Sequence, residues 1–200
     1  ITASGTGVLN VILWSDFGNV NNGGVSVHSV TTNGGHLWIG GSNTSGGSYT
    51  WNGLTVGNGP SVGSVNNNWN GLDFIGPVST NGGHVLIWGG NGYSSGTSGI
   101  HNMAGGSSSI NSGSGDITLI AKNIAGNDIN ITTTGKLSLL PDGGSYPAAI
   151  TWNGAMSGSD FNASSTFDKL LIKNYSSLGG LTIGYYNGQI SGGSPVVQTN

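Results

Sequence analysis

The chain has 200 residues, with 40 glycines, 34% hydrophobic residues, only 6% charged residues and no cysteine. That length fits one ordinary domain or one stretch of a repeat array, and the lack of cysteine leaves no disulfide and no thiolate metal site. The formal net charge is −3, and the four cations are all lysines beyond residue 121, so we expect no nucleic-acid partner. No apolar run reaches the roughly 18 residues that a membrane-spanning helix needs, so we expect no membrane insertion.

Short apolar runs recur along the chain and have the composition of β-strands. They are three to five residues long, rich in Val, Ile, Leu and Trp, and bounded by Gly, Asn, Ser and Thr. In chain order they are 11–14, 25–27, 36–39, 54–56, 72–75, 84–88, 117–121, 129–131, 136–140, 148–152, 169–173 and 181–183. Several alternate with period two, as in Ile117-Thr118-Leu119, and no helical spacing is sustained. The chain is therefore predicted to be all-β.

The dipeptide Asn-Gly occurs nine times and separates many of these runs. Both residues tolerate the left-handed backbone region that tight turns require. The common role of Asn-Gly between strands is a two-residue hairpin, which would give an antiparallel β-sandwich or barrel. The very short strands and the frequent turns favour instead a β-solenoid, in which each coil stacks on the previous one.

One sequence motif, which we call the repeated phrase, occurs twice with little change, as TNGGHLWIGG at 32–41 and as TNGGHVLIWGG at 80–90. The two copies are 48 residues apart (81 − 33), and Trp-Asn-Gly similarly recurs at 51–53, 69–71 and 152–154. In a solenoid, equivalent residues of successive coils lie above one another. An interval of 48 residues would then correspond to about two coils of the usual repeat length.

The stretch from residue 89 to residue 115 is low in complexity and rich in Gly and Ser. Its candidates for burial are Ile100, Met103 and Ile110, and it is predicted to be a loop, a poorly packed coil or a weak boundary. The strand pattern resumes at Asp116-Ile117, which favours one continuous solenoid segment over residues 1–200. Because the first residue is Ile and no signal-peptide pattern precedes the first apolar run, we interpret the chain as a piece of a longer protein.

Several stretches carry a family resemblance, among them VILWSDFGNVNNGGVSV, STNGGHVLIWGGNGYSSG, SGSGDITLIAKNI, TTTGKLSLLPDGG and SLGGLTIGYYNG. They resemble the filamentous-haemagglutinin-type β-strand-repeat proteins of bacteria, which are very large secreted adhesins, many of them exported by two-partner secretion. The resemblance covers most of the chain and rests on the repeated pattern of short apolar runs separated by polar turns. It implies a right-handed parallel β-helix, exposure at the cell surface, and a role in adhesion or aggregation.

Enzymatic activity is not expected, although β-helices include polysaccharide hydrolases and lyases. Hydrolysis of a glycosidic bond needs two carboxylates several Å apart, and no close Asp pair stands in this sequence, which also lacks Arg and Glu. Asp116 and Asp128 lie 12 residues apart beside similar strands (128 − 116) and could stack, but turn capping is the favoured role. The seven carboxylates are Asp16, Asp73, Asp116, Asp128, Asp142, Asp160 and Asp168.

The histidines give no better case for a site. His36 and His84 occupy the same place in the repeated phrase, and two stacked imidazoles could in principle bind a metal. Zinc usually needs three or four ligands, and neither Asp nor Cys lies near them in sequence, so we expect them to begin strands after a turn. His28 and His101 have no partner visible in the sequence. The calcium-binding nonapeptide GGxGxD is absent, and we expect no metal and no cofactor.

The aromatic residues are the remaining candidates for binding. Trp38 and Trp88 lie inside apolar runs and are predicted to be core residues. The other candidates are residues that could pack at corners or present a platform to sugar rings, namely Trp51, Trp69, Trp152, Tyr49, Tyr93, Tyr185 and Tyr186. Packing is the favoured role for the three tryptophans of this set, and no binding residue is assigned.

The sequence thus predicts a structural or adhesive segment of a large extracellular bacterial surface protein or filament. Its partners would be further copies of itself or adjoining coils of the parent chain, joined through strand edges. The alternative is a carbohydrate-binding β-helix module that recognises surface glycans, and an enzyme ranks third.

Overall fold

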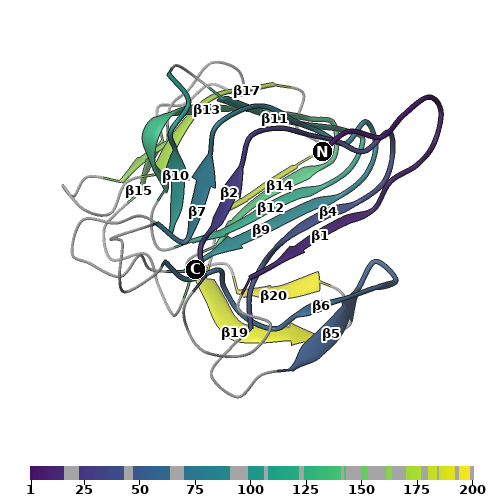
Figure 1. Ribbon diagram of the computed structural model, residues 1–200. Helices are drawn as coiled ribbons and strands as arrows, with labels where there is room; N and C mark the ends of the chain where they lie inside the picture. Colours follow the sequence, from purple (N-terminus) through teal and green to yellow (C-terminus); the bar gives the residue numbers. More distant parts are fainter. Residues whose placement is uncertain are drawn as a thin grey trace.

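The computed structural model describes residues 1–15, 23–42, 47–63, 70–90, 99–105, 108–121, 124–140, 142, 150–152, 161–163, 170–176, 180–183, 185–191 and 194–198. At 125–128 and beyond residue 142, the description covers the backbone alone. Every helix or strand assigned within these ranges is a β-strand, and most neighbouring strands run parallel. The all-β prediction is confirmed, and the parallel pairing of the two large sheets excludes an antiparallel sandwich (Figure 1).

One sheet has six strands, and each is parallel to its neighbours. Its strands, in spatial order, are β1 (Val11–Trp14), β4 (Leu37–Gly40), β9 (Val85–Gly89), β12 (Ile117–Ala121), β14 (Lys136–Leu140) and β18 (Gly180–Ile183). Spatial order and chain order are the same, so each strand pairs with the next strand that the chain contributes to this sheet.

The second sheet has ten strands and is bent, so that short strands lie end to end along one coil of the chain. Its strands are β2 (Val25–Val27), β3 (Val30–Thr31), β7 (Leu72–Phe74), β8 (Val78–Ser79), β10 (Ile100–Asn102), β11 (Ser108–Gly113), β13 (Ile124–Thr133), β15 (Ile150–Trp152), β16 (Phe161–Ala163) and β17 (Leu170–Ser176). β2, β7, β10, β13 and β17 form one parallel row, and β3, β8, β11 and β13 form the other. Beyond β17 the order changes, because β16 and β15 add antiparallel strands.

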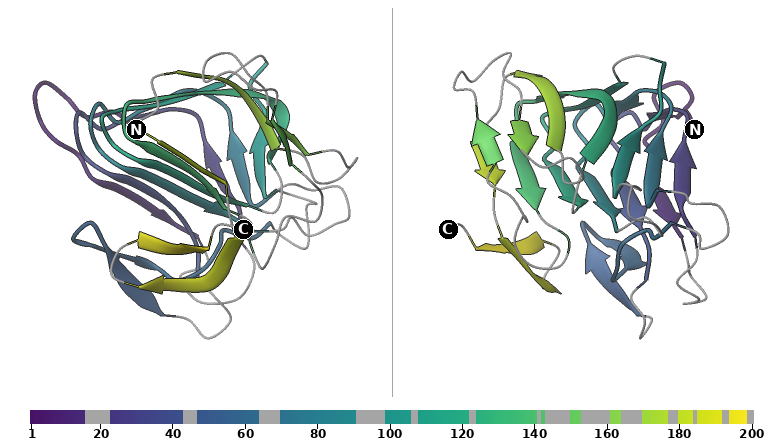
Figure 2. Two further views of the ribbon diagram at one scale, coloured as in Figure 1. Left: turned by 180° about the vertical axis from the view of Figure 1, so that it is seen from behind. Right: turned by 90° about the vertical axis from the view of Figure 1, so that its left-hand side faces the viewer.

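The chain alternates between the two sheets. It passes from β2 and β3 to β4, from β7 and β8 to β9, from β10 and β11 to β12, and from β13 to β14. The two sheets face each other, as the views in Figure 2 show, and the buried apolar side chains of both form one shared core.

The repeated phrase marks adjacent strands, and the expectation that its 48-residue interval covers about two coils is wrong. Leu37 of β4 pairs directly with Val85 of β9, so the interval is a single step across the sheet. The following steps are shorter, since Val85 pairs with Ile117 and Ile117 with Leu137. Part of the long step from β4 to β9 is taken up by a hairpin, β5 (Ser48–Trp51) and β6 (Leu54–Gly57), which leaves the sheet.

The inner face of the six-stranded sheet is apolar, and part of the outer face is apolar as well, which explains why several of its strands read as nearly continuous hydrophobic runs. The inner face contributes Leu37, Ile39, Val85, Ile87, Ile117, Leu119, Leu137 and Leu139 to the core between the sheets. The outer face carries a second cluster in which Trp38, Leu86 and Trp88 are joined by Trp51 and Val56 of the hairpin. The hairpin therefore packs against this cluster on the outer face and buries it (Figure 1).

The low-complexity stretch contributes strands to the bent sheet. β10 and β11 pair in parallel with β7, β8 and β13, while residues 91–98 and 106–107 lie outside the described residues. Ile100 and Ile110 are buried as predicted. The prediction for Met103 is wrong, because it follows the end of β10 and its side chain is 53% exposed. A second hairpin, β19 (Tyr185–Ser191) and β20 (Ser194–Gln198), ends the described chain.

Candidate functional site: a stacked polar turn

The most regular polar feature of the described residues is a turn that leads into β4, β9, β12 and β14 of the six-stranded sheet. In the first two copies, Asn33 and Asn81 have φ of 53° and 51°, and the glycines that follow have φ of 95° and 113°. Positive φ at both central residues defines a type I′ turn, for which Asn-Gly is the preferred pair. The sequence therefore sets the local conformation of this turn.

Successive turns are hydrogen-bonded to one another. The amide of Gly34 donates to the carbonyl of Thr80 at 2.6 Å, and the amide of Gly82 donates to the carbonyl of Ser112 at 2.6 Å. Between the last two turns the direction is reversed, because the amide of Thr134 donates back to the carbonyl of Gly113 at 2.7 Å. These amides, which would face solvent in an isolated turn, are thereby satisfied by a neighbouring turn.

A column of buried hydroxyls closes the turns from inside. Thr80 Oγ1 donates to the carbonyl of Gly83, and Ser112 Oγ donates to the carbonyl of Gly115. Thr133 Oγ1 reaches the carbonyl of Gly115 at 2.6 Å. The equivalent Thr32 hydroxyl binds in the same way within its own turn, and all four hydroxyl side chains are buried. Because a buried hydroxyl without a partner is costly, these bonds favour Ser or Thr at this position.

The last residue of each turn is glycine for a steric reason. A Cβ on Gly83 would overlap the carbonyl oxygen of Gly35, and a Cβ on Gly115 would overlap that of Gly83. Gly35 meets the carbonyl of Leu9 in the same way. The turns therefore stack backbone on backbone, at a distance that no other residue allows.

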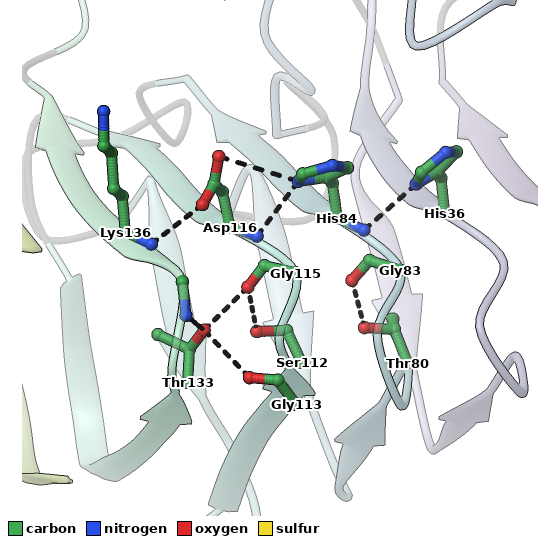
Figure 3. Close-up of polar contacts among 11 residues, drawn as sticks. His36, Thr80, Gly83, His84, Ser112, Gly113, Gly115, Asp116, Thr133 and Lys136 are labelled. Carbon is green, nitrogen blue, oxygen red and sulfur yellow. Dashed lines mark hydrogen bonds and ion pairs between the residues drawn. The ribbon is translucent and has the colours of Figure 1, made fainter. Parts of the chain in front are cut away.

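The next position forms a ladder of side chains that accept hydrogen bonds from the neighbouring strand's backbone (Figure 3). Asn10 Oδ1 accepts from the amide of His36 at 2.8 Å, and His36 Nδ1 accepts from the amide of His84 at 3.0 Å. His84 Nδ1 accepts from the amide of Asp116 at 3.0 Å, and Asp116 Oδ1 accepts from the amide of Lys136 at 2.8 Å. We call these five residues the polar ladder.

The hydrogen bonds of the ladder assign the tautomer of both histidines. A neutral imidazole has one donor and one acceptor nitrogen, so Nδ1, which accepts, carries no proton, and Nε2 carries it. A metal ligand must offer a free lone pair, and in this arrangement neither ring has one. His36 and His84, whose rings stack with centroids 5.2 Å apart, thus act as backbone acceptors at the start of β4 and β9.

The carboxylates are spread over the molecule. Asp116 lies in the turn before β12, whereas Asp128 belongs to β13 in the other sheet, so the two do not stack as considered from their spacing. Asp142 Oδ1 accepts from Trp88 Nε1 at 2.9 Å, and burial raises the pKa of its carboxyl. Asp16, Asp160 and Asp168 lie outside the described residues.

The structure gives Asp73 and His101 partners that sequence spacing did not reveal. Asp73 is 7% exposed and accepts from Asn70 Nδ2 at 2.8 Å. His101, which the register of β7 and β10 places beside it, has Nδ1 at 3.3 Å from Asp73 Oδ1 in a geometry that makes no hydrogen bond. His28 is exposed.

The tryptophans with described side chains are mostly buried. Trp38, Trp51 and Trp88 are at most 5% exposed, which confirms core packing for all three and leaves none of them as a platform for sugar rings. Trp38 Nε1 donates to Tyr49 Oη at 3.2 Å, and burial raises the pKa of Tyr49 to about 12. Trp69 and Tyr93 lie outside the described residues, as do the side chains of Trp152, Tyr185 and Tyr186.

Sequence reasoning missed the link between Asp116 and the histidine pair. The signal was present, because Asp116 follows Gly115 as His84 follows Gly83, but the unequal steps between turns hid the alignment. Within the described ranges, no group of three or more His, Cys, Asp or Glu residues could hold a metal ion. In the same ranges, no helix has the length and apolar character to span a membrane.

Comparison with known proteins adds no identity to these observations. No protein-family model matches the sequence, and comparisons with curated proteins and with solved structures found no match. The sheets, the stacked turns and the polar ladder are therefore the basis for any functional proposal.

Proposed function

We propose that this chain is a segment of a right-handed parallel β-helix that serves as a structural and adhesive part of a large extracellular bacterial surface protein or filament. The observation that carries the proposal is the order of the six-stranded sheet, in which every strand pairs in parallel with the next one along the chain, from β1 to β18. The stacked turns and the polar ladder support the same role, because they hold successive coils in register.

The polar side chains of the stacked turns and of the polar ladder are used in structure, which also favours a structural role. Asp116 and Asp142 accept hydrogen bonds from a backbone amide and an indole, and the histidine pair accepts backbone amides. We therefore expect purified protein to show no turnover of polysaccharides. Activity that a single Asp→Asn substitution abolishes would contradict this expectation.

Self-association through a strand edge is part of the proposal. In β1, the amide of Val11 donates to the carbonyl of His36, just before β4, and the amide of Ser15, just beyond β1, donates to Gly40 of β4. Because amides alternate in direction along a strand, the amide of Ile12 faces the outer edge. Its side chain is 37% exposed, and an exposed edge strand is a template for another strand. The partner would be an adjoining coil of the parent chain or another copy of this segment.

Sedimentation velocity over a range of micromolar concentrations, with electron microscopy, tests self-association. We expect oligomers or filaments that resist added salt, because backbone pairing holds them. Ile12→Lys should weaken assembly by placing a charge on the edge strand, whereas Val8→Lys, at an exposed residue outside the strand, should not. A wild-type chain that stays monomeric would rule out self-association, and monomers that bind glycans in an array would favour the carbohydrate-binding alternative.

A further inference from the structure

Two of the acceptors in the polar ladder differ from the rest because they can take up a proton near neutral pH. Asn10 offers an amide oxygen and Asp116 a carboxylate oxygen, whereas His36 and His84 offer the lone pair of Nδ1. Histidine has an ordinary pKa of about 6.5, so only these two links of the ladder depend on protonation in mildly acidic conditions.

Protonation changes an imidazole from an acceptor into a donor at the nitrogen that holds the ladder together. The lone pair of His36 Nδ1 binds the amide of His84, and the lone pair of His84 Nδ1 binds the amide of Asp116, both at 3.0 Å. A proton on Nδ1 would face the hydrogen of that amide, so the bond is lost and two donors oppose each other. The rings stack at 5.2 Å with an angle of 25° between their planes, so two imidazolium charges would also repel.

The two rings have different surroundings. His36 lies between Asn10 and His84, and the Trp51 ring of β5 packs against it with centroids 5.7 Å apart. His84 has Asp116 Oδ2 at 3.7 Å from its Nδ1.

Further along the ladder, Lys136 gives its backbone amide to Asp116, and its side chain extends away from the rings (Figure 3). Among the described residues, His84 is thus the titratable group beside His36, and His36 and Asp116 are the titratable groups beside His84. In the same residues, no carboxylate forms a hydrogen bond or ion pair with His36.

We propose that the polar ladder is a pH-sensitive seam, in which neutral His36 and His84 tie together the starts of β4, β9 and β12, and protonation in mild acid releases them. The inference concerns the stability of the stacked strands and stands whether or not the segment is adhesive.

The direction of the effect follows from proton linkage. Burial, together with a smaller contribution from His84, lowers the pKa of His36 below its ordinary value of 6.5. The unfolded chain then binds the proton more tightly than the folded chain, so stability rises with pH in this range. The stabilisation is complete above about pH 6.5 and is lost as the pH falls through the lowered pKa of His36.

The test replaces both histidines with asparagine, the residue that the chain has at the first position of the polar ladder, Asn10. In the double variant His36→Asn, His84→Asn, side-chain amide oxygens can accept the same backbone amides, as Asn10 does, and cannot be protonated in mild acid. The unfolding equilibrium constant should be measured by chemical denaturation between about pH 7.5 and pH 5, where histidine is the side chain that titrates.

For the wild type, we expect the unfolding constant to rise below about pH 6.5, by up to about tenfold per pH unit for each proton taken up. The double variant should lose most of that rise. His28→Asn, at an exposed histidine outside the ladder, is the matched control and should behave like the wild type. Equal pH dependence in the wild type and the double variant would overturn the proposal.

A second measurement on the wild-type protein keeps the proposal testable if the double variant does not fold. The ¹⁵N chemical shifts of the imidazole rings, from long-range proton–nitrogen NMR spectra at neutral pH, report the tautomer directly. We expect the Nε2–H form for both His36 and His84, with the His84 and Asp116 amide signals lost or shifted as the rings titrate. An Nδ1–H form at either ring would contradict the proposed seam.

Discussion

Two turns with the same central residues behave differently in this molecule. Asn81-Gly82 lies in the stacked column before β9, and Asn52-Gly53 closes the hairpin of β5 and β6. Both asparagines have positive φ, 51° and 45°. The amide of Gly82 donates to the next turn, at Ser112, whereas the hairpin turn only reverses the chain so that Trp51 faces Leu54.

The residues on either side of Asn-Gly account for this difference. In the stacked turn, Thr80 comes before the pair and supplies the hydroxyl that binds the carbonyl of Gly83 after it. Gly83 has no side chain, so it can lie directly on the backbone of Gly35. In the hairpin the flanking residues are Trp51 and Leu54, whose large side chains suit cross-strand pairing. The Thr and the final Gly of Thr-Asn-Gly-Gly therefore permit stacking, whereas Asn-Gly alone specifies only the turn.

The largest expected effect comes from adding a methyl group to the glycine of the stacked turn. Gly83→Ala should reduce the free energy of unfolding by about 3 kcal/mol or more, because backbone on both sides prevents relaxation. Gly53→Ala is the matched change in the hairpin, where nothing lies within 4 Å of the added Cβ and φ is +78°. Its cost should be only about 1 kcal/mol, from the positive φ.

Urea denaturation monitored by tryptophan fluorescence measures both glycine variants. Equal costs for Gly83→Ala and Gly53→Ala would mean that the close backbone contact in the column does not limit stability.

Removing a hydroxyl should have an intermediate effect that again depends on the turn. Thr80→Val keeps the shape of the side chain but leaves the buried carbonyl of Gly83 without its hydroxyl partner, so we expect a loss of about 2 kcal/mol. Thr55→Val makes the same change at an exposed position of β6 and should alter stability by less than about 0.5 kcal/mol. Thermal and urea unfolding of the two variants in parallel give the comparison, and a Thr80 variant as stable as the wild type would contradict it.

The smallest difference is expected where the two turns are alike. Asn81→Ala and Asn52→Ala each replace a residue that tolerates positive φ with one that does not, which costs roughly 1 kcal/mol. Because this strain is local to the turn, the two losses should agree within about 0.5 kcal/mol. A much larger loss for Asn81→Ala, measured by the same unfolding experiment, would show that the asparagine side chain also contributes to the stack.

The all-β fold and the regions of the core could be predicted from the sequence because they depend on local patterns. Apolar runs with β-branched residues between Gly and Asn have few other ways to be buried, and Trp38 and Trp88 inside such runs are core residues. The number of residues between one strand of the sheet and its paired neighbour could not be predicted, because a hairpin of unknown length intervenes between Leu37 and Val85.

The candidate site could be predicted only in part. The equivalence of His36 and His84 is visible in the repeated phrase, and both begin strands as expected. Asp116 stands after a different turn sequence, and only the register of β9 with β12 brings it to His84. Met103 looked like a buried residue because it is apolar, but whether it is buried depends on where β10 ends.

By itself, the sequence determined the strands, the turns and their conformation, because short-range sterics act within a few residues. Asn and Gly take positive φ, Thr or Ser binds the turn from inside, and alternating apolar residues form strands. Only the tertiary structure decided which turns stack, which hairpin packs on the outer face of the six-stranded sheet, and which side chains form the polar ladder. The hydrogen bonds of the polar ladder, for example, join residues 20 to 48 positions apart, and a loop of any length between them leaves the local sequence signals unchanged.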